Sequence, residues 1–227
     1  MAATHIGLIF HGIGDPGRAL ETGEAPYWIS VEQFEMTLAM IAKARQRDRI
    51  RISFDDGNLS DHDIALPRLL DYGLTADFFP LTGRIGRAGS LGPAQIQALE
   101  AAGMGIGGHG VAHLDWRRLE ADALKTELTQ SRRELEAICT GQVTTTAIPF
   151  GSYNAAVLRM VRAAGYTCAY SSDRGRMNPT AFLRPRTSVR GDMNEADIAH
   201  ILTGKMSLPQ KVRRMVGMAS RRFPIGF

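Results

Sequence analysis

The amino-acid sequence predicts an α/β fold: a distorted, TIM-like (β/α)7 barrel with parallel strands, in a single domain. Three observations lead to this prediction. A unit made of an amphipathic helix, a glycine and a short apolar strand recurs along the chain. About seven apolar segments have the length and pattern of strands. Polar residues suited to catalysis follow several of these segments, as expected where barrel strands end.

The N-terminal part begins with a buried strand over residues 6–10, which places His11 at its C-terminal end. A connection rich in Gly and Pro follows over residues 13–29, and loops of this length in compact domains are often functional. Ser30 then opens a helix with the pattern of a capping box. Residues 50–54 alternate apolar and polar side chains and predict the second strand.

The later strands each follow a helix that ends at a glycine, which fits a left-handed C-cap. The alternation of helix and strand indicates a parallel sheet. A long helix over residues 119–140 should pack outside the sheet with its charged side chains, Glu127 among them, in solvent. The predicted strands end near Phe10, Phe54, Pro80, Gly108, Ile148, Ser171 and Val189.

Length and composition fit one compact domain of 227 residues with 44% apolar content. Its two cysteines, Cys139 and Cys168, lack metal-type spacing and indicate buried thiols in a reducing compartment. No leader peptide or membrane span is recognisable, so we expect a cytoplasmic location. The net charge of +4 permits an anionic partner without requiring one.

The chain changes character near its C-terminus. We assign residues 1–204 to the catalytic barrel and residues 205–227 to a basic tail. In the tail, Lys and Arg are interleaved with Met, Leu and Val, as in a basic amphipathic helix. Such a helix could rest on the inner face of an anionic membrane; the alternative is a terminal helix packed on the barrel. No nucleic-acid-binding module is present, so nucleic acid is not predicted as a partner.

Two adjacent carboxylates, Asp55 and Asp56, follow the second predicted strand directly. Adjacent carboxylates repel each other, and a fold keeps them together mainly when a cation or a shared proton relieves the repulsion. The alternative is a plain turn, because Asp, Gly and Asn are turn formers. His109 and His113 lie past another predicted strand end. A catalytic zinc site needs about three protein ligands, and one Asp with two His supplies that number.

Three segments together resemble a known family, the polysaccharide deacetylases, also called carbohydrate esterase family 4. Ser-Phe-Asp55-Asp56-Gly resembles its first motif and His109-Gly-Val-Ala-His113 its second, while Pro149-Phe150-Gly is similar to its Pro-Tyr-Gly motif. The resemblance covers about residues 4–190. It implies that Asp55 is the general base, that Asp56 and both histidines bind the metal, and that Pro149 and Phe150 line the substrate groove. The Phe150 N–H would face the oxyanion.

The sequence departs from the family pattern at three places. Gly110 replaces the usual Ser or Thr after the first histidine. The Arg that normally precedes Pro-Tyr-Gly is missing, and we expect Arg186 to supply its charge; the alternative is an ordinary surface or ion-paired Arg. The usual histidine of the last strand is also missing. His11 resembles the histidine that one branch of the family carries on its first strand, which as imidazolium would protonate the departing amine; the alternative is a strand-end histidine with a structural role.

The resemblance implies a metal-dependent hydrolase that removes N-acetyl groups from an N-acetylated glycan or glycolipid. A divalent metal ion, with Zn²⁺ as first choice, would activate the attacking water, and Asp55 would take its proton. Trp28, in the long loop, is our candidate for stacking on a sugar face, although aromatic residues are as often part of the core. Two alternatives remain: an amidohydrolase acting on a small amide or cyclic ureide, and an inactive carbohydrate- or membrane-binding module.

Overall fold

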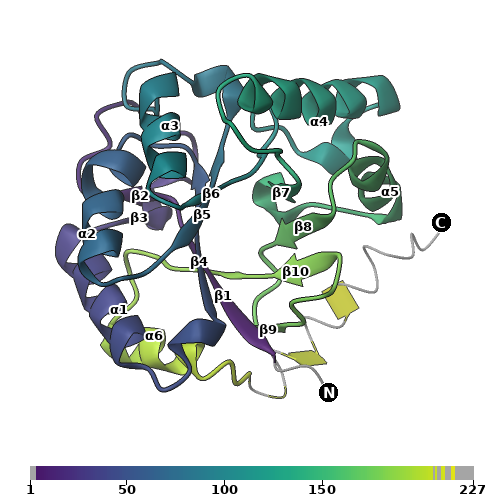
Figure 1. Cartoon of the computed structure of the whole chain (residues 1–227). Coiled ribbons are helices and arrows are strands. Elements are labelled where there is room, and N and C mark those ends of the chain that lie inside the picture. The colour runs from purple at the N-terminus through teal and green to yellow at the C-terminus, as the bar shows by residue number, and fades with distance from the viewer. Residues whose placement is uncertain (1–3, 207, 209–210, 213–215, 218–227) are drawn as a thin grey trace.

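A computed structural model describes residues 4–206, 208, 211–212 and 216–217, and Figure 1 shows its strands surrounded by helices. Four parallel strands form the first part of the wall. In spatial order they are β1 (His5–Phe10), β4 (Ile50–Asp56), β5 (Ala76–Pro80) and β6 (Gly105–Ile106). A second parallel set consists of β7 (Thr145–Ala147), β8 (Cys168–Ser171) and β10 (Leu183–Pro185).

Two junctions close the strands into a ring. A parallel bridge between Gly108 and Thr146 joins the end of β6 to β7. On the other side, β10 pairs with β8, and after Arg186 the chain continues as β11 (Thr187–Ser188), which pairs with β1. The last strand therefore begins on one part of the wall and ends on the other. The predicted barrel of parallel strands is confirmed.

Three further short strands lie outside this ring. The long connection after β1 contains β2 (Gly12–Ile13) and β3 (Trp28–Ile29), which pair in parallel and draw its two ends together. Strand β9 (Arg176–Met177) pairs antiparallel with the beginning of β1. The parallel pair β2–β3 holds residues 14–27 as a loop beside the C-terminal end of β1.

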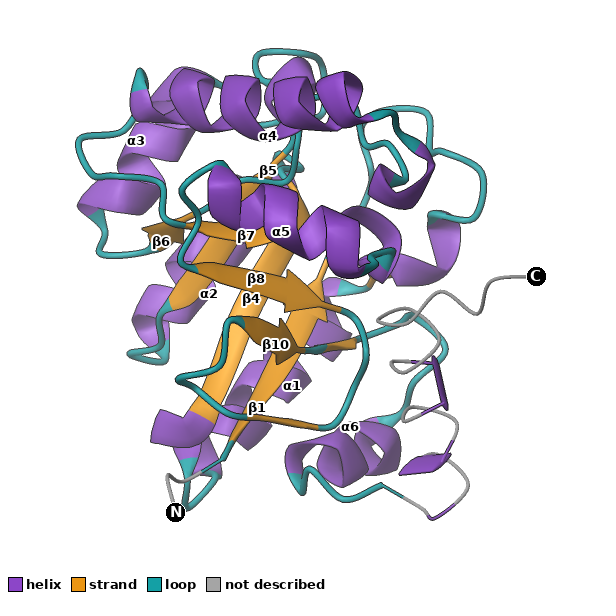
Figure 2. Cartoon of the chain, turned by 90° about the vertical axis from the view of Figure 1, so that its right-hand side faces the viewer, coloured by secondary structure: helices purple, strands orange, loops and turns teal. Residues whose placement is uncertain are grey.

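Helices pack against the outside of the strands, and in Figure 2 α4 and α5 lie above β8 and β10. Ser30 caps the first helix by accepting a hydrogen bond from the Gln33 N–H. The predicted long helix is α4, and a π-helical turn at Asp61–Ala65 precedes α2. The helices are α1 (Val31–Lys43), α2 (Leu66–Asp71), α3 (Pro93–Ala101), α4 (Ala121–Glu136), α5 (Ala155–Ala163) and α6 (Glu195–Leu202).

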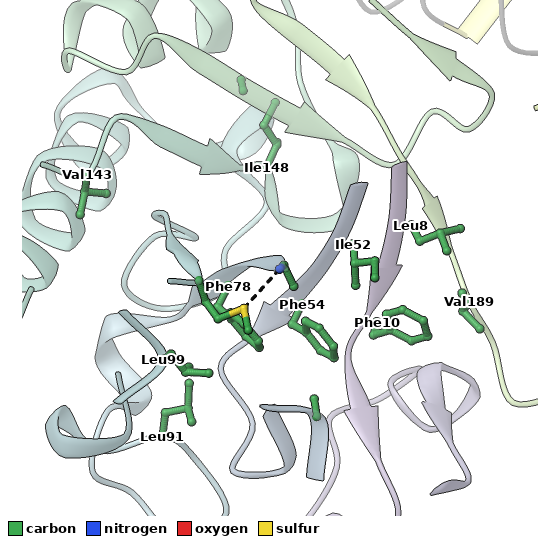
Figure 3. Packing of buried hydrophobic residues seen from close by; sticks show 14 of the residues in the cluster. Leu8, Phe10, Ile52, Phe54, Phe78, Leu91, Leu99, Val143, Ile148 and Val189 are labelled. Atoms are coloured by element: carbon green, nitrogen blue, oxygen red, sulfur yellow. Dashed lines mark hydrogen bonds between the residues drawn. The ribbon is translucent and has the colours of Figure 1, made fainter. Parts of the chain in front are cut away.

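The core between strands and helices explains why the acidic pair faces inward. Phe10, Phe54 and Phe78 are in register on β1, β4 and β5, and their buried rings lie side by side (Figure 3). Ring centroids are 5.3 Å apart for the first two and 4.7 Å for the last two. Burying one such side chain contributes about 1.5–3 kcal/mol. Since strand side chains alternate, the packing of Phe54 toward the helices turns Ser53 and Asp55 into the barrel.

Most of the predicted C-terminal tail lies outside the described residues. Among the residues that the structure describes, no helix combines the length and apolar character that a membrane crossing requires. Membrane contact through the tail, the division at residue 204 and the cytoplasmic location therefore stay predictions.

Candidate active site

A cavity of about 260 Å³ opens where the barrel strands end, and it collects most of the predicted site residues. Side chains that follow β1 and side chains from the junction of β10 and β11 meet there. This is expected because the C-terminal ends of parallel strands share one rim. The predicted residues that line it are His11, Asp55, Asp56, His109, His113, Phe150 and Arg186. Pro149, which was also expected to line the groove, is buried and does not line this cavity.

The backbone at the end of β4 directs the side chain of Asp56 toward the two histidines. Asp56 has φ of 76°, a left-handed conformation that costs a non-glycine residue about 1–3 kcal/mol. Gly57 follows with φ of 72°, and a Cβ there would lie 2.6 Å from Cβ of Pro80. Asp55 and Asp56 are the last two residues of β4 and pair with β5, and the turn begins at Gly57. The acidic pair therefore lies at the end of a strand, and the alternative of a plain turn was wrong.

Asp56, His109 and His113 form a cluster suited to a metal ion. One potential ligand atom from each lies within 4.8 Å of the other two. Oδ1 of Asp56 is 3.3 Å from Nε2 of His109 and 3.5 Å from Nε2 of His113. That oxygen is buried and makes no hydrogen bond within the described part of the chain. A buried carboxylate oxygen that faces two imidazole nitrogens fits a divalent cation, so these residues can hold one.

The histidine ring orientations agree with this reading. Nδ1 of His109 lies 2.9 Å from the Ala147 carbonyl oxygen, which can only accept a hydrogen bond. Nδ1 therefore carries the proton, and the lone pair on Nε2 faces Asp56. Burial would lower the pKa of His109, but Asp56 and Asp55 outweigh it and raise that pKa. Burial would likewise raise the pKa of Asp56, yet His109 and the other imidazoles hold it well below its usual range.

Asp55 is held by Arg186 from the junction of β10 and β11. Nη1 and Nη2 of Arg186 each donate to one oxygen of Asp55 at 2.8 Å, and Nη1 also donates to Ser53 Oγ at 2.7 Å. The guanidinium carbon lies over the neighbouring rings of Phe79 and Tyr170, 5.2 and 5.3 Å from their centroids. Burial would raise the pKa of Asp55, but Arg186 reverses this and lowers it. Asp55 is thus an ionised carboxylate fixed in place.

These contacts bear on the two interpretations of Arg186. Its side chain is only 2% exposed and is paired with Asp55, so it is not a surface arginine. That Arg186 replaces the missing motif arginine stays a prediction.

His11 lies in the cavity wall with its ring 4.8 Å from that of Tyr27. Burial lowers the pKa of His11, although Asp56 and Asp55 act in the opposite direction. The resting imidazole is therefore neutral at pH 7. The expected imidazolium is not the resting form, because burial disfavours the charged ring more than the carboxylates favour it.

Comparison with known sequences decides the family. A sequence profile described as polysaccharide deacetylase matches residues 42–169, a span that includes Asp55, Asp56, His109 and His113. The chain belongs to the polysaccharide deacetylase family.

Individual relatives are distant. YxkH of Bacillus subtilis strain 168, named as a polysaccharide deacetylase, is 27% identical over 126 residues. That match covers 56% of this chain, and the chain spans 45% of the length of YxkH. Among solved structures, the Streptococcus pyogenes deacetylase PplD, in complex with acetate, has a TM-score of 0.74 at 19% identity. IcaB from Ammonifex degensii has a TM-score of 0.71 at 18% identity.

The two structural alignments cover nearly the whole barrel. They include 89% of this chain and 99% of PplD, and 88% of this chain and 97% of IcaB. At this level of identity the likeness shows a shared fold, and the chemistry has to be argued from the residues of this chain itself.

The departure from the family pattern at Gly110 has a structural explanation. The Glu127 carboxylate accepts hydrogen bonds from the Val111 and Ala112 N–H groups at 2.8 and 3.2 Å. Gly110 has φ of 83°, and a Cβ on it would lie 2.6 Å from the same oxygen of Glu127. The expectation that Glu127 is solvated was wrong, because helix α4 packs this side chain under the histidine loop.

The long loop contributes a different aromatic residue from the one predicted. Trp28 does not line the cavity: its ring packs on Gly12, and its N–H donates to Glu24 at 3.3 Å. Tyr27 is the residue that lines the cavity. On the opposite rim, Phe150 is 62% exposed and its ring stacks on His113 with centroids 4.3 Å apart.

Glu21 is a site residue that sequence reasoning missed. It lines the cavity, and its Oε2 lies 2.8 Å from Nδ1 of His113. No local motif marks this position. The only signal in the sequence is the length of the loop that carries it.

Proposed function

We propose that this polysaccharide deacetylase is a metal-dependent hydrolase that removes N-acetyl groups from an amino sugar in a polysaccharide, oligosaccharide or glycolipid. The observation that carries the proposal is the ionised Asp55, clamped by Arg186 directly beside the Asp56, His109 and His113 cluster. One carboxylate is free to take a proton while its neighbour can hold a cation. The family membership supports the same chemistry.

Asp56, His109 and His113 would hold the divalent ion. We propose Zn²⁺, because one carboxylate and two imidazoles are a common donor set for catalytic zinc. Such an ion, when bound, polarises the amide carbonyl as a Lewis acid and lowers the pKa of water. The backbone carbonyl of Ala147 keeps His109 in the required tautomer.

Asp55 would act as the general base. A carboxylate has about four lone-pair positions, and Arg186 uses one on each oxygen, so both oxygens can still accept a proton. As water attacks the carbonyl carbon, the new C–O bond forms and the O–H bond breaks toward Asp55. Arg186 fixes the carboxylate in position and keeps it ionised.

Phe150 and His11 would complete the reaction. The Phe150 N–H would donate a hydrogen bond to the developing oxyanion, a contribution that typically amounts to about 2.7–4 kcal/mol. His11 would give a proton to the amine as the C–N bond breaks. Since its resting imidazole is neutral, it has to take up a proton during the cycle before it donates one. The products are acetate and a free amino group.

The small volume of the cavity is also compatible with a second candidate function, hydrolysis of a small non-sugar amide. Its volume of about 260 Å³ lies below the usual range for ligand pockets, about 300–1,000 Å³, and the loop around Tyr27 forms one wall. A space of this size suits a single sugar ring or a small non-sugar amide. Both substrates would use the same residues, so an assay has to separate them.

The test is release of acetate by the zinc-loaded protein. We expect acetate from N-acetylated oligosaccharides with the wild type and a loss of about 10²–10⁴-fold with Asp55→Asn, at unchanged zinc content. Asp63→Asn, at an exposed position, is the control and should keep full activity. Turnover of cyclic ureides in place of acetylated sugars would favour the second candidate. Zinc binding without turnover of either substrate would favour an inactive binding module.

A further inference from the structure

The two histidines of the metal cluster are held by different kinds of partner. Nδ1 of His109 is bonded to a backbone carbonyl of the barrel wall, whereas Nδ1 of His113 meets the carboxylate of Glu21 at 2.8 Å. His113 has φ of 53° and is 13% exposed in its side chain. Its orientation therefore depends on a side chain that lies 92 residues away in the sequence.

Glu21 determines which nitrogen of His113 carries the proton. A carboxylate accepts hydrogen bonds, so Nδ1 of His113 must donate and bear the hydrogen. The lone pair is then on Nε2, the atom that lies 3.5 Å from Oδ1 of Asp56. Carboxylate partners of this kind fix ring orientation and increase the basicity of ligating histidines.

The carboxylate of Glu21 is itself held by a second partner besides His113. Its Oε1 accepts a hydrogen bond from Arg84, which belongs to the turn Thr82–Arg84. The backbone N–H of Gly83 in that turn donates to the carbonyl of Val111, within the segment that leads to His113, at 3.0 Å. The turn that carries Arg84 is thus hydrogen-bonded to the segment that carries His113. Glu21, through its contacts with both side chains, connects the long loop to these two segments.

The rest of the loop is anchored to the turn after the acidic pair. Arg18 donates to the carboxylate of Glu24 and, at 2.7 Å, to the side-chain oxygen of Asn58. Residues of this loop, Glu21 and Tyr27 among them, also form a wall of the cavity. The same segment therefore shapes the substrate space and contacts a ligand of the metal cluster.

We propose that Glu21 is a positioning residue: it holds His113 with Nε2 available for the metal, and it couples the loop over residues 14–27 to metal binding. The inference rests on the proposed metal-dependent function and extends it to a residue outside the family motifs. Glu21 acts through His113, because its carboxylate contacts the nitrogen that faces away from Asp56.

The first experiment measures zinc affinity by competition with a chelator. Glu21→Ala should weaken zinc binding about 10–100-fold, and Glu21→Gln, which keeps an acceptor without the charge, should weaken it less. Thr22→Ala changes the adjacent exposed cavity residue and should leave the affinity within about twofold. In a His113→Ala background, Glu21→Ala should have no further effect. An unchanged affinity, or an equal loss in that background, would overturn the proposal.

The second experiment does not need metal or activity. Nitrogen-15 NMR of the metal-free protein at about pH 8.5, where an ordinary imidazole is neutral, reports which ring nitrogen carries hydrogen. We expect the Nδ1–H form of His113 in the wild type and a mixture of tautomers in Glu21→Ala. The same tautomer in both proteins would refute the role of Glu21 even if the protein released acetate. Because the NMR measurement needs no activity, it can be interpreted even if the protein releases no acetate.

Discussion

Arg186→Met removes the buried cation that holds Asp55. Arg186 is 2% exposed and donates two hydrogen bonds of 2.8 Å to the carboxylate, so the variant leaves an unpaired charge inside the barrel. Removing one partner of a buried ion pair typically costs about 3–5 kcal/mol. Domains of this kind are stable by about 5–15 kcal/mol, so the variant should fold with a clear loss in the free energy of unfolding.

The pH dependence of that loss follows from the pKa of Asp55. In the wild type Arg186 lowers this pKa, so the pair stabilises the fold above the unfolded value of about 3.9 and stops doing so as the pH falls. In Arg186→Met the largest influence that opposes burial is gone, although His109 and His11 still act against it, so the pKa of Asp55 should rise and a protonated Asp55 is favoured. The cost of the substitution should therefore be largest near pH 8 and smaller near pH 5.

Urea denaturation of wild type and variant at pH 5 and pH 8 measures this difference. Adding Asp55→Asn to Arg186→Met removes the unpaired charge, and the double variant should regain most of the lost stability at pH 8. Arg176→Met, at the exposed position of strand β9, is the control and should change little. An equal cost at both pH values, together with no recovery in the double variant, would refute the assignment of Arg186 as the partner that keeps Asp55 ionised.

Two further predictions concern buried groups near the site. Asp61 is fully buried, and burial together with the active-site carboxylates raises the pKa of its carboxyl well above the usual range. The contribution of Asp61 to stability should therefore decrease as the pH rises above about 4. Asp61→Asn should gain stability relative to the wild type between pH 4.5 and 8, measured by urea denaturation, and an equal difference at pH 4.5 and pH 8 would argue against the raised pKa. Gly110→Ser would place a Cβ 2.6 Å from Glu127 Oε2, whereas Gly86 has a similar positive φ with open space around it. Thermal unfolding should show that Gly110→Ser costs about 1–3 kcal/mol more than Gly86→Ser, and equal losses would mean that backbone conformation alone matters.

Local patterns in the sequence determined the strands and the metal cluster. Alternation over residues 50–54 is a property of neighbouring side chains, and it turns Asp55 inward because Phe54 packs outward. The acidic pair and the pair His109 and His113 each lie within a few residues, so their proximity needs no knowledge of packing. The parallel order of the strands then brings the two groups to one rim.

Contacts between distant segments were decided only by the tertiary structure. Arg186 was a candidate from its place on the last strand, but only the two hydrogen bonds in the folded chain show that it holds Asp55, 131 residues away. Glu127 looked like a solvated helix residue, and Glu21 had no local signal at all. Each of these roles depends on how a helix or loop packs against a distant turn, and short-range periodicity carries no information about that packing.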